Sequence, residues 1–315
     1  MRNLKPRVSV VIPLFNRETM IKETLDSLRE QTFQNWECLI VDDHSQDNGV
    51  SVVKQYCELD RRFRCLLRPK KIIKGANSCR NYGLERTRGE LIYWLDSDDL
   101  MHPLLFEYTL KFFEDPTLDY VRFRRKLFSG LFDKGIITTE PMKPGKNLLS
   151  SPLLIEAMLL NEIEYNTCNV VWRKSSLGSE KFCEDIVYAD EWEYYTRLLA
   201  MGLKGKNLEN FLIYGRKHSA STTAEFKMKN SVRIESKIKA TKLVLKTLDY
   251  FSLHTPRLKK YFLRLSFTLN SSEILERCLE TFPSSRTEKW KFTLGFKVYP
   301  CIRPFFVLKG KISKV

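Results

Sequence analysis

The feature that most constrains the fold is an alternation of strand-like and helix-like segments in the first third of the chain. Four short segments are apolar and rich in β-branched or aromatic side chains, as buried strands are: residues 7–14, 36–41, 63–67 and 90–95. Between them, residues 17–31 carry apolar side chains at helical spacing, and residues 75–87 lead from a loop into a helix. This order predicts an α/β fold with a mostly parallel sheet flanked by helices.

The middle of the chain continues with mixed elements. Further strands are expected at residues 120–128, 135–139, 169–173 and 211–214, and helices at residues 153–160 and 190–202. Ser45 is a candidate N-cap for the helix that follows the second strand. The segment 141–146 contains two prolines and is expected to be a loop.

Charge divides the chain into two parts. Residues 226–315 contain 20 Lys/Arg and 6 Asp/Glu, a net charge of +14, whereas the whole chain carries +15. We therefore predict one near-neutral α/β domain at residues 1–225 and a basic helical extension at residues 226–315. Such an asymmetry indicates an anionic partner, either a membrane surface or a nucleic acid. In the extension, aromatic residues mixed with lysines favour an anionic membrane surface, and the other interpretation is a helical appendage that packs on the domain.

The cysteines and the start of the chain bear on the compartment. Eight cysteines occur without CxxC spacing, which indicates free thiols and no zinc site. No apolar run has the length of a membrane-spanning helix, and the first residues lack the apolar core of a secretory signal. These observations predict a cytoplasmic protein, either free or peripheral on the inner face of the membrane.

Polar clusters follow three of the expected strands. Asn16 follows the first strand, Asp42 and Asp43 follow the second, and the run from Asp96 to Asp99 follows the fourth. Ligands of parallel sheets bind beyond the carboxyl ends of the strands, so these clusters should meet at one edge. Carboxylates crowded in one turn repel each other unless a cation neutralises them, and oxygen ligands suit Mg²⁺ or Mn²⁺.

Each cluster also has a plainer interpretation when it is taken alone. The acidic run is compatible with a solvated turn, and Asp42 and Asp43 with turn or cap chemistry. The loop before Arg80 could admit a diphosphate at a helix start, but an arginine on a helix surface is the more common outcome. The place of the acidic run directly after an apolar strand, and the order of the three clusters, favour function over these alternatives.

Three blocks that contain these clusters resemble the family 2 glycosyltransferases of the GT-A fold, of the type that builds bacterial cell-surface polysaccharides. The blocks are VSVVIPLFNRE, QTFQNWECLIVDDHSQD and KGANSCRNYGLERTRGELIYWLDSDDLMHP, in order over residues 8–103, and a weaker likeness continues to about Ser221. The resemblance implies a GT-A fold and inverting transfer of a sugar from a nucleotide-sugar donor, UDP-linked, to a hydroxyl of a glycan or lipid-linked acceptor. It also implies a divalent metal cofactor, Mn²⁺ or Mg²⁺.

The resemblance also implies roles for individual residues. Those expected to bind the nucleotide sugar are Pro13, Phe15, Asn16, Asp42, Asp43, Ala76, Arg80, Asp96 and Ser97. Those expected at the metal are Asp98, Asp99 and His218, with Asp98 as the main contact and Asp99 in support.

The general base is expected in an acidic pair at the start of a later helix. The family usually has Glu-Asp before an aromatic residue, whereas this chain has Asp190 and Glu191 before Trp192. By register Glu191 takes the catalytic position, with Asp190 as the alternative. Without the resemblance, acids at a helix N-terminus are explained by the helix dipole alone.

Two other function classes compete with a glycosyltransferase. A nucleic-acid-binding protein would use the basic extension for phosphate contacts, but that extension contains no recognisable binding motif and the acidic clusters would repel a polyanion. A nucleotidyltransferase would have a Gly-rich phosphate loop after the first strand, where this chain has Leu14 to Glu18 without glycine. We therefore expect no nucleic-acid partner.

Overall fold

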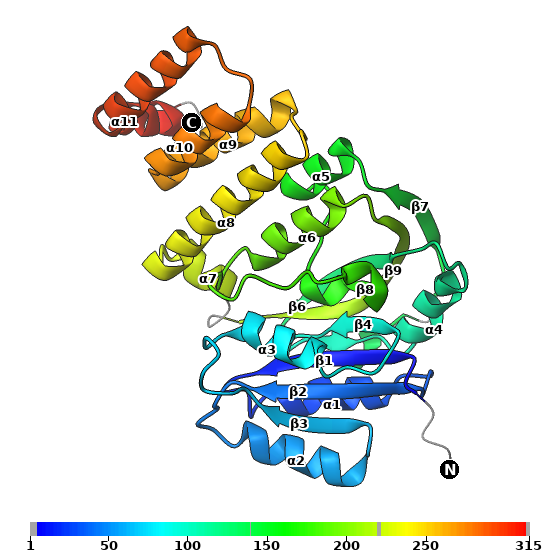
Figure 1. The fold of residues 1–315 in the computed structure, drawn as a ribbon. Coiled ribbons are helices and arrows are strands. Elements are labelled where there is room, and N and C mark those ends of the chain that lie inside the picture. Colours follow the sequence, from blue (N-terminus) through cyan, green and yellow to red (C-terminus); the bar gives the residue numbers. More distant parts are fainter. Residues whose placement is uncertain (1–4, 139, 219–221, 313–315) are drawn as a thin grey trace.

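The protein is built around one nine-stranded mixed sheet (Figure 1). The computed structural model describes residues 5–138, 140–218 and 222–312. The strands are β1 Val8–Leu14, β2 Trp36–Asp42, β3 Phe63–Leu67, β4 Leu91–Trp94, β5 Leu100–Met101, β6 Tyr120–Ser129, β7 Pro144–Leu149, β8 Val170–Arg173 and β9 Lys204–Lys217. Their order in the sheet is β3-β2-β1-β4-β8-β6-β9-β5, with β7 on β9.

The helices follow in chain order. They are α1 Ile21–Arg29, α2 Gly49–Leu59, α3 Ala76–Leu84, α4 Leu105–Leu110, α5 Pro152–Leu159, α6 Asp190–Ala200, α7 Thr222–Lys227, α8 Ser231–Tyr250, α9 Pro256–Leu269, α10 Ser272–Thr281 and α11 Arg286–Ile312. The four N-terminal strands β3, β2, β1 and β4 pair in parallel, as predicted. Beyond β4 the sheet becomes mixed, because β8 runs antiparallel to both β4 and β6.

Three local predictions were wrong. The helix α2 is capped at Asn48, and the Ser45 hydroxyl accepts a hydrogen bond from the Asn16 amide instead (3.1 Å). Around residue 135 the chain forms a 3-10 turn in which the Asp133 side chain accepts from Gly135 N, and residue 139 lies outside the described residues. The expected loop 141–146 overlaps β7, which pairs with β9. β7 lies at the edge of the sheet, and an edge strand tolerates a proline.

The sheet has a hydrophobic core on each face. Side chains of β1 alternate, so that Val10 and Ile12 lie in the cluster with α1, α2 and α4, whereas Val11 lies in the cluster with α3 and α6. The strands of the parallel half are buried along their whole length, except for most of β3 at its edge. Two covered faces explain why these strands are continuous apolar runs.

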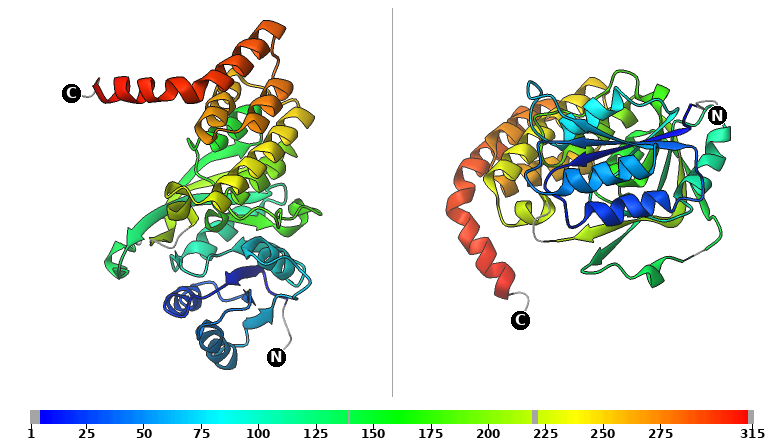
Figure 2. Two further views of the ribbon diagram at one scale, coloured as in Figure 1. Left: turned by 90° about the vertical axis from the view of Figure 1, so that its left-hand side faces the viewer. Right: turned by 90° about the horizontal axis from the view of Figure 1, so that it is seen from below.

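The helices α8, α9 and α10 belong to the core on the α6 face. Val244 of α8, Phe262 of α9 and Leu275 of α10 lie in the same buried cluster as Trp94 of β4. The proposed division at residue 225 is therefore crossed by a continuous core. In contrast, Figure 2 shows α11 projecting as an arm from the rest of the molecule. Among the described residues, no helix combines the length and the apolar character needed to cross a membrane.

Candidate active site

A cavity of about 950 Å³ opens where β1, β2 and β4 end. Segments far apart in sequence supply its walls, including the loops after these strands, the start of α6 and residues of α8. Twelve of the residues singled out in the sequence line it: Pro13, Phe15, Asp43, Ala76, Arg80, Asp96, Ser97, Asp98, Asp99, Asp190, Glu191 and His218. The strand-end clusters therefore meet at one edge of the sheet, as predicted.

Asn16 and Asp42 do not line this cavity. The Asn16 side chain accepts a hydrogen bond from Gln46 N (2.8 Å), and Asn16 adopts a left-handed backbone (φ 50°) that asparagine tolerates well. The Asp42 carboxylate accepts from Ser45 N (3.1 Å). Both side chains form hydrogen bonds within the loops after β1 and β2, so in this structure they shape the loops beside the cavity.

One end of the cavity combines an aromatic ring with a fixed carboxylate. Phe15 is partly exposed, and the Lys74 amine lies 3.9 Å from its ring centroid. Asp43 is buried and ion-paired with Arg68, whose guanidinium also donates to the carbonyls of Pro69 and Ile72. Because Arg68 is held on several sides, the Asp43 carboxylate has a fixed orientation toward the cavity.

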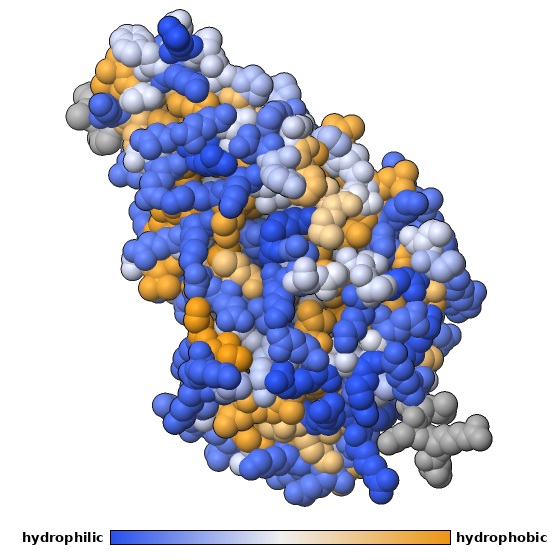
Figure 3. Space-filling view, viewed as in Figure 1, coloured by the Kyte–Doolittle hydropathy of each residue, from blue (hydrophilic) through white to orange (hydrophobic). Residues whose placement is uncertain are grey.

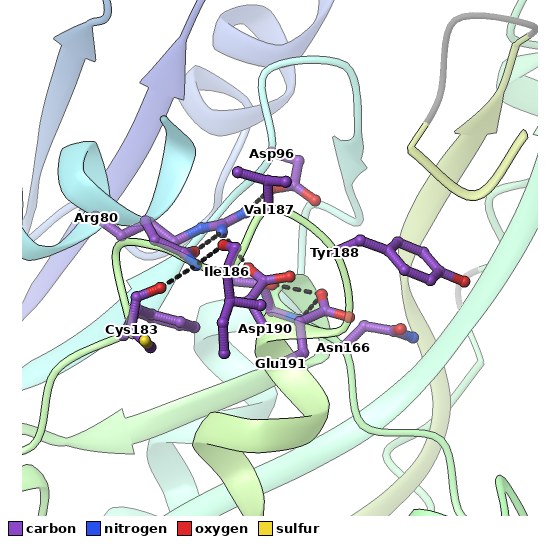
Figure 4. A network of polar contacts seen from close by, with 12 residues as sticks. Arg80, Asp96, Asn166, Cys183, Ile186, Val187, Tyr188, Asp190 and Glu191 are labelled. Carbon is purple, nitrogen blue, oxygen red and sulfur yellow. Dashed lines mark hydrogen bonds and ion pairs between the residues drawn. The ribbon is translucent and has the colours of Figure 1, made fainter. Parts of the chain in front are cut away.

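Arg80 of α3 connects the acidic turn to α6 (Figure 4). Its guanidinium donates to Asp96 (2.9 Å) and to Asp190 (3.0 Å), and also to Asn77 (2.7 Å). Burial opposes the positive charge, but the carboxylates of Asp96 and Asp190 raise the pKa of Arg80 above its ordinary value. One permanently charged side chain thus sets the spacing between β4 and the helix that carries the candidate bases.

Asp98 and His218 face each other at the middle of the cavity. The Asp98 carboxylate lies 2.9 Å from His218 Nε2 and 3.7 Å from Arg17 Nε. Both side chains are only slightly exposed, although they line the cavity. The two residues are 120 positions apart in the chain and meet because β9 ends beside the acidic turn.

Asp99 points into the protein and holds this arrangement together. One oxygen pairs with Arg125 of β6 (3.0 Å) and accepts from the Cys168 thiol (3.1 Å), and the other accepts from the Arg216 amide of β9 (3.0 Å). Burial raises the pKa of Asp99 to about 7, against the lowering effect of Arg125. Asp99 therefore fixes the strand end that carries His218.

Two groups of side chains are candidates to hold a divalent cation. Ligand atoms of Asp96, Asp99 and Cys168 lie within 4.8 Å of one another. However, Arg80 and Arg125 already neutralise the two carboxylates, and burial raises the pKa of the Cys168 thiol well above its ordinary value. Asp98 and His218 both line the cavity and bring a carboxylate oxygen and an imidazole nitrogen within 2.9 Å of each other, a donor set that suits Mn²⁺ or Mg²⁺ and fits the expected metal.

The two candidate bases lie in the first turn of α6. Asp190 is tied to Arg80, whereas Glu191 accepts hydrogen bonds from the amide (2.7 Å) and the hydroxyl (2.5 Å) of Thr167. Burial and the neighbouring Asp190 carboxylate raise the pKa of Glu191 to about 7. A carboxyl group with this pKa can both accept and release a proton near neutral pH.

Several side chains of the site were missed in the sequence. Arg68 directly follows β3, so the strand-end rule that selected Asp43 would have found it. Arg125, Thr167 and Lys237 belong to segments without a motif. Only the folded chain brings Arg125 and Lys237 to the cavity and Thr167 to Glu191.

Comparison with known proteins bears on the fold and the family of the chain. Over 105 residues the chain is 40% identical to poly(ribitol-phosphate) beta-N-acetylglucosaminyltransferase TarP of Staphylococcus aureus, covering 32% of this chain and 31% of TarP. Over 94 residues it is 34% identical to the GalNAc(5)-diNAcBac-PP-undecaprenol beta-1,3-glucosyltransferase of Campylobacter jejuni, covering 30% of each. The matched segments thus span about a third of the length of these curated relatives.

Solved structures extend the likeness to almost the whole chain. S. aureus TarS 1–349 in complex with UDP-GlcNAc superposes with a TM-score of 0.58 at 16% identity, covering 92% of this chain and 92% of that segment. The mannosyltransferase PcManGT of Pyrobaculum calidifontis, in complex with GDP-Man and Mn²⁺, superposes with a TM-score of 0.52 at 16% identity, covering 94% of this chain and 81% of that one. These likenesses show a GT-A-like fold with C-terminal helices. The sequence profile of Glycosyl transferase family 2 matches residues 9–172, and the chain belongs to this glycosyltransferase family.

Proposed function

We propose that this glycosyltransferase moves a sugar from a UDP-linked donor to a hydroxyl of a glycan or lipid-linked acceptor, with inversion. The observation that carries the proposal is the cavity itself. It joins an aromatic and carboxylate end at Phe15 and Asp43, the Asp98–His218 pair, and the Glu191 carboxyl in one continuous space. The solved relatives with UDP-GlcNAc and with GDP-Man support a nucleotide sugar as the ligand.

In this proposal different residues bind different parts of the donor. Phe15 packs on the base beside Pro13, and Asp43 accepts hydrogen bonds from the base or ribose. The wall formed by Ala76 and Ser97 lets the diphosphate approach the backbone, while Arg80 holds Asp96 in place. Donor recognition thus depends on groups that the fold has already fixed.

Asp98 and His218 would hold the Mn²⁺ or Mg²⁺ ion. When bound, the ion neutralises the charge that develops on the departing nucleoside diphosphate. The chain's own contribution is to keep the carboxylate and the imidazole facing the cavity, which Asp99 does through the Arg216 amide two residues before His218. The complex of PcManGT with Mn²⁺ supports a metal in this fold.

Glu191 is the preferred general base of this proposal. One of its oxygens is fixed by Thr167, which orients the carboxylate, and its pKa of about 7 gives it the basicity to take a proton from an acceptor hydroxyl. Asp190 is paired with Arg80 and is better suited to positioning that arginine. The acceptor would then attack the anomeric carbon opposite the leaving diphosphate.

We also infer that α11 binds an anionic membrane surface on which a lipid-linked acceptor is carried. The sequence of α11 contains seven Lys/Arg and one Asp/Glu. Phe296 and Tyr299 of α11 pack on Phe267 of α9, whereas Trp290, Leu294 and Val298 are exposed at four-residue spacing. Figure 3 shows apolar and hydrophilic surface mixed at the end of the molecule that carries this helix.

A thermal-shift panel of nucleoside diphosphates and nucleotide sugars, with and without Mn²⁺, tests the donor site and the metal together. UDP and UDP-sugars should raise Tm more than other nucleotides, and more with Mn²⁺ than without it. The Asp98→Asn variant should lose the Mn²⁺-dependent part, whereas the control Glu58→Gln on the exposed surface of α2 should keep it. The donor assignment is wrong if no nucleotide shifts Tm, and the metal assignment is wrong if Asp98→Asn behaves as wild type.

A further inference from the structure

Lys237 of α8 lines the cavity, although no step of the proposed reaction uses it. Its amine lies 3.4 Å from the ring centroid of Trp192, the residue that follows the candidate base Glu191. The other contacts of the Trp192 ring are with Tyr261 and Phe262 of α9, and its ring N–H donates to the carbonyl of Leu159. The ring is therefore fixed, and it holds the lysine at the cavity wall.

The positive charge of Lys237 has no carboxylate beside it. Among the ion pairs of the described residues, Lys237 occurs in none, while its neighbour on the same helix, Lys239, pairs with Asp185 (2.6 Å). Burial alone lowers the pKa of the Lys237 amine to about 7. A partly buried amine without a carboxylate partner costs stability, and such an amine at a cavity wall is a candidate to bind an anionic ligand.

A second cation also lines this cavity. Lys227 of α7 also lines it and forms no ion pair among the residues that the structure describes. In contrast, the nearby Arg233 is matched by Glu225 (2.7 Å) and donates to the carbonyl of Val187. Arg233 thus fixes α8 against the loop before α6, whereas within the described part of the chain neither Lys227 nor Lys237 has a carboxylate as ion-pair partner.

We propose that the cavity wall between α6 and α8 binds an anionic group of the acceptor, a phosphate or a carboxylate, through Lys237, with Lys227 of α7 as a second cation of the same cavity. The inference rests on the proposed function, since the acceptor is placed by the base. A base must lie within hydrogen-bond reach of the acceptor hydroxyl, and Lys237 sits over the residue next to Glu191. The donor diphosphate is expected at the Asp98–His218 pair instead.

The test uses the reactivity of the amine. A lysine with a pKa near 7 is largely neutral at pH 7.5 and should be acetylated by a brief pulse of acetic anhydride before the exposed lysines are, as peptide mapping by mass spectrometry can measure. Glycerol 1-phosphate, added while UDP and Mn²⁺ fill the donor site, should reduce acetylation of Lys237 several-fold, and glycerol should not. Glucuronate in place of glycerol 1-phosphate distinguishes a carboxylate from a phosphate.

Two results would overturn the proposal. Protection by UDP alone, with no further effect of either anion, would mean that the amine contacts the donor. Protection by neither UDP nor the anions would mean that Lys237 binds no anion. A Tm shift with UDP and Mn²⁺ on the same samples shows whether the donor site itself is intact, so failure of the donor assignment is recognised separately.

A pair of variants separates binding from a structural role. Lys237→Met removes the charge and keeps the length, so it should raise Tm while abolishing the stabilisation by glycerol 1-phosphate in the presence of UDP. Lys239→Met, two residues further along α8 at the lysine that pairs with Asp185, should keep that stabilisation. A Lys237→Met variant that still responds to glycerol 1-phosphate would contradict the proposal.

Discussion

Two neighbouring carboxyl groups at the start of α6 differ in what holds them. Asp190 shares Arg80 with Asp96, whereas Glu191 is oriented by the amide and hydroxyl of Thr167. The first arrangement fixes a permanently charged arginine, and the second leaves a carboxyl group with a pKa of about 7 at the cavity wall. The same helix turn can therefore serve donor binding with one residue and proton transfer with the other.

Substitution of the two acids should separate these roles. Glu191→Gln should lower kcat by about 10²–10⁴-fold with little change in the donor KM, because a general base acts only in the chemical step. Asp190→Asn should mainly raise the donor KM, by about tenfold, because Arg80 loses one charged partner. Steady-state kinetics with a varied donor measures both. If Asp190→Asn loses kcat and Glu191→Gln does not, the base is Asp190.

The pH dependence of kcat offers an independent check on Glu191. A base must be deprotonated, so kcat should fall as the pH drops below about 7. The hydrogen bond from the Thr167 hydroxyl lowers the pKa of Glu191, so Thr167→Val should move this acid limb to higher pH. Asp99 also has a pKa of about 7, and its hydrogen bond from Cys168 lowers it. If the acid limb of the kcat profile moves with Cys168→Ala and not with Thr167→Val, the group that titrates is Asp99.

At the scale of elements, the donor site depends on how closely α3 approaches the sheet. Gly83 of α3 lies directly over β1 and β2, and a Cβ atom there would overlap Val11 and come within 3.2 Å of Val41. These strands end in the loops that carry Phe15 and Asp43, and α3 itself carries Arg80. A shift of this helix would therefore move three parts of the site at once.

Gly83→Ala should consequently destabilise the protein although alanine favours helices. Overpacking a buried contact costs about 1–3 kcal/mol, and helix propensity offsets at most about 1 kcal/mol. Urea unfolding followed by circular dichroism should show a lower midpoint. The matched control is Gly295→Ala in α11, where a Cβ meets nothing within 4 Å and stability should rise or stay unchanged. A Gly83→Ala midpoint at or above wild type would show that α3 can move aside without cost.

The sequence predicted those parts of the fold and of the site whose signal lies within one short segment. The parallel strands were predictable because their apolar runs are continuous, and Phe63–Leu67 was placed with its observed bounds. The Ser45 cap failed because Asn16, 29 residues earlier, supplies its hydrogen-bond donor. Likewise the strand-end rule selected the loops that form the site, but not which side chain of each loop turns inward, so Asp43 lines the cavity and Asp42 does not.

At the scale of the whole molecule, the basic extension separates into two kinds of helix. Many charges of α8–α10 are matched, as Lys242 is by Glu273 and Arg257 by Glu156 and Glu162. These helices also share the core of the α6 face, so they support the wall of the cavity that holds Trp192 and Lys237. The projecting α11, with seven Lys/Arg and one Asp/Glu, also offers net positive charge to a partner.

Binding of α11 to an anionic membrane is therefore expected to need both its apolar face and its charge. Each basic residue near such a surface contributes on the order of 1 kcal/mol, and Trp290 and Leu294 would enter the interface. Co-sedimentation should retain the protein on phosphatidylglycerol vesicles but not on phosphatidylcholine vesicles, and less at high salt.

The double variant Trp290→Ser and Leu294→Ser should lose most of the bound fraction. The control Leu131→Ser removes an exposed leucine outside α11 and should bind as wild type. Equal sedimentation of both variants would exclude α11 as the membrane-binding element.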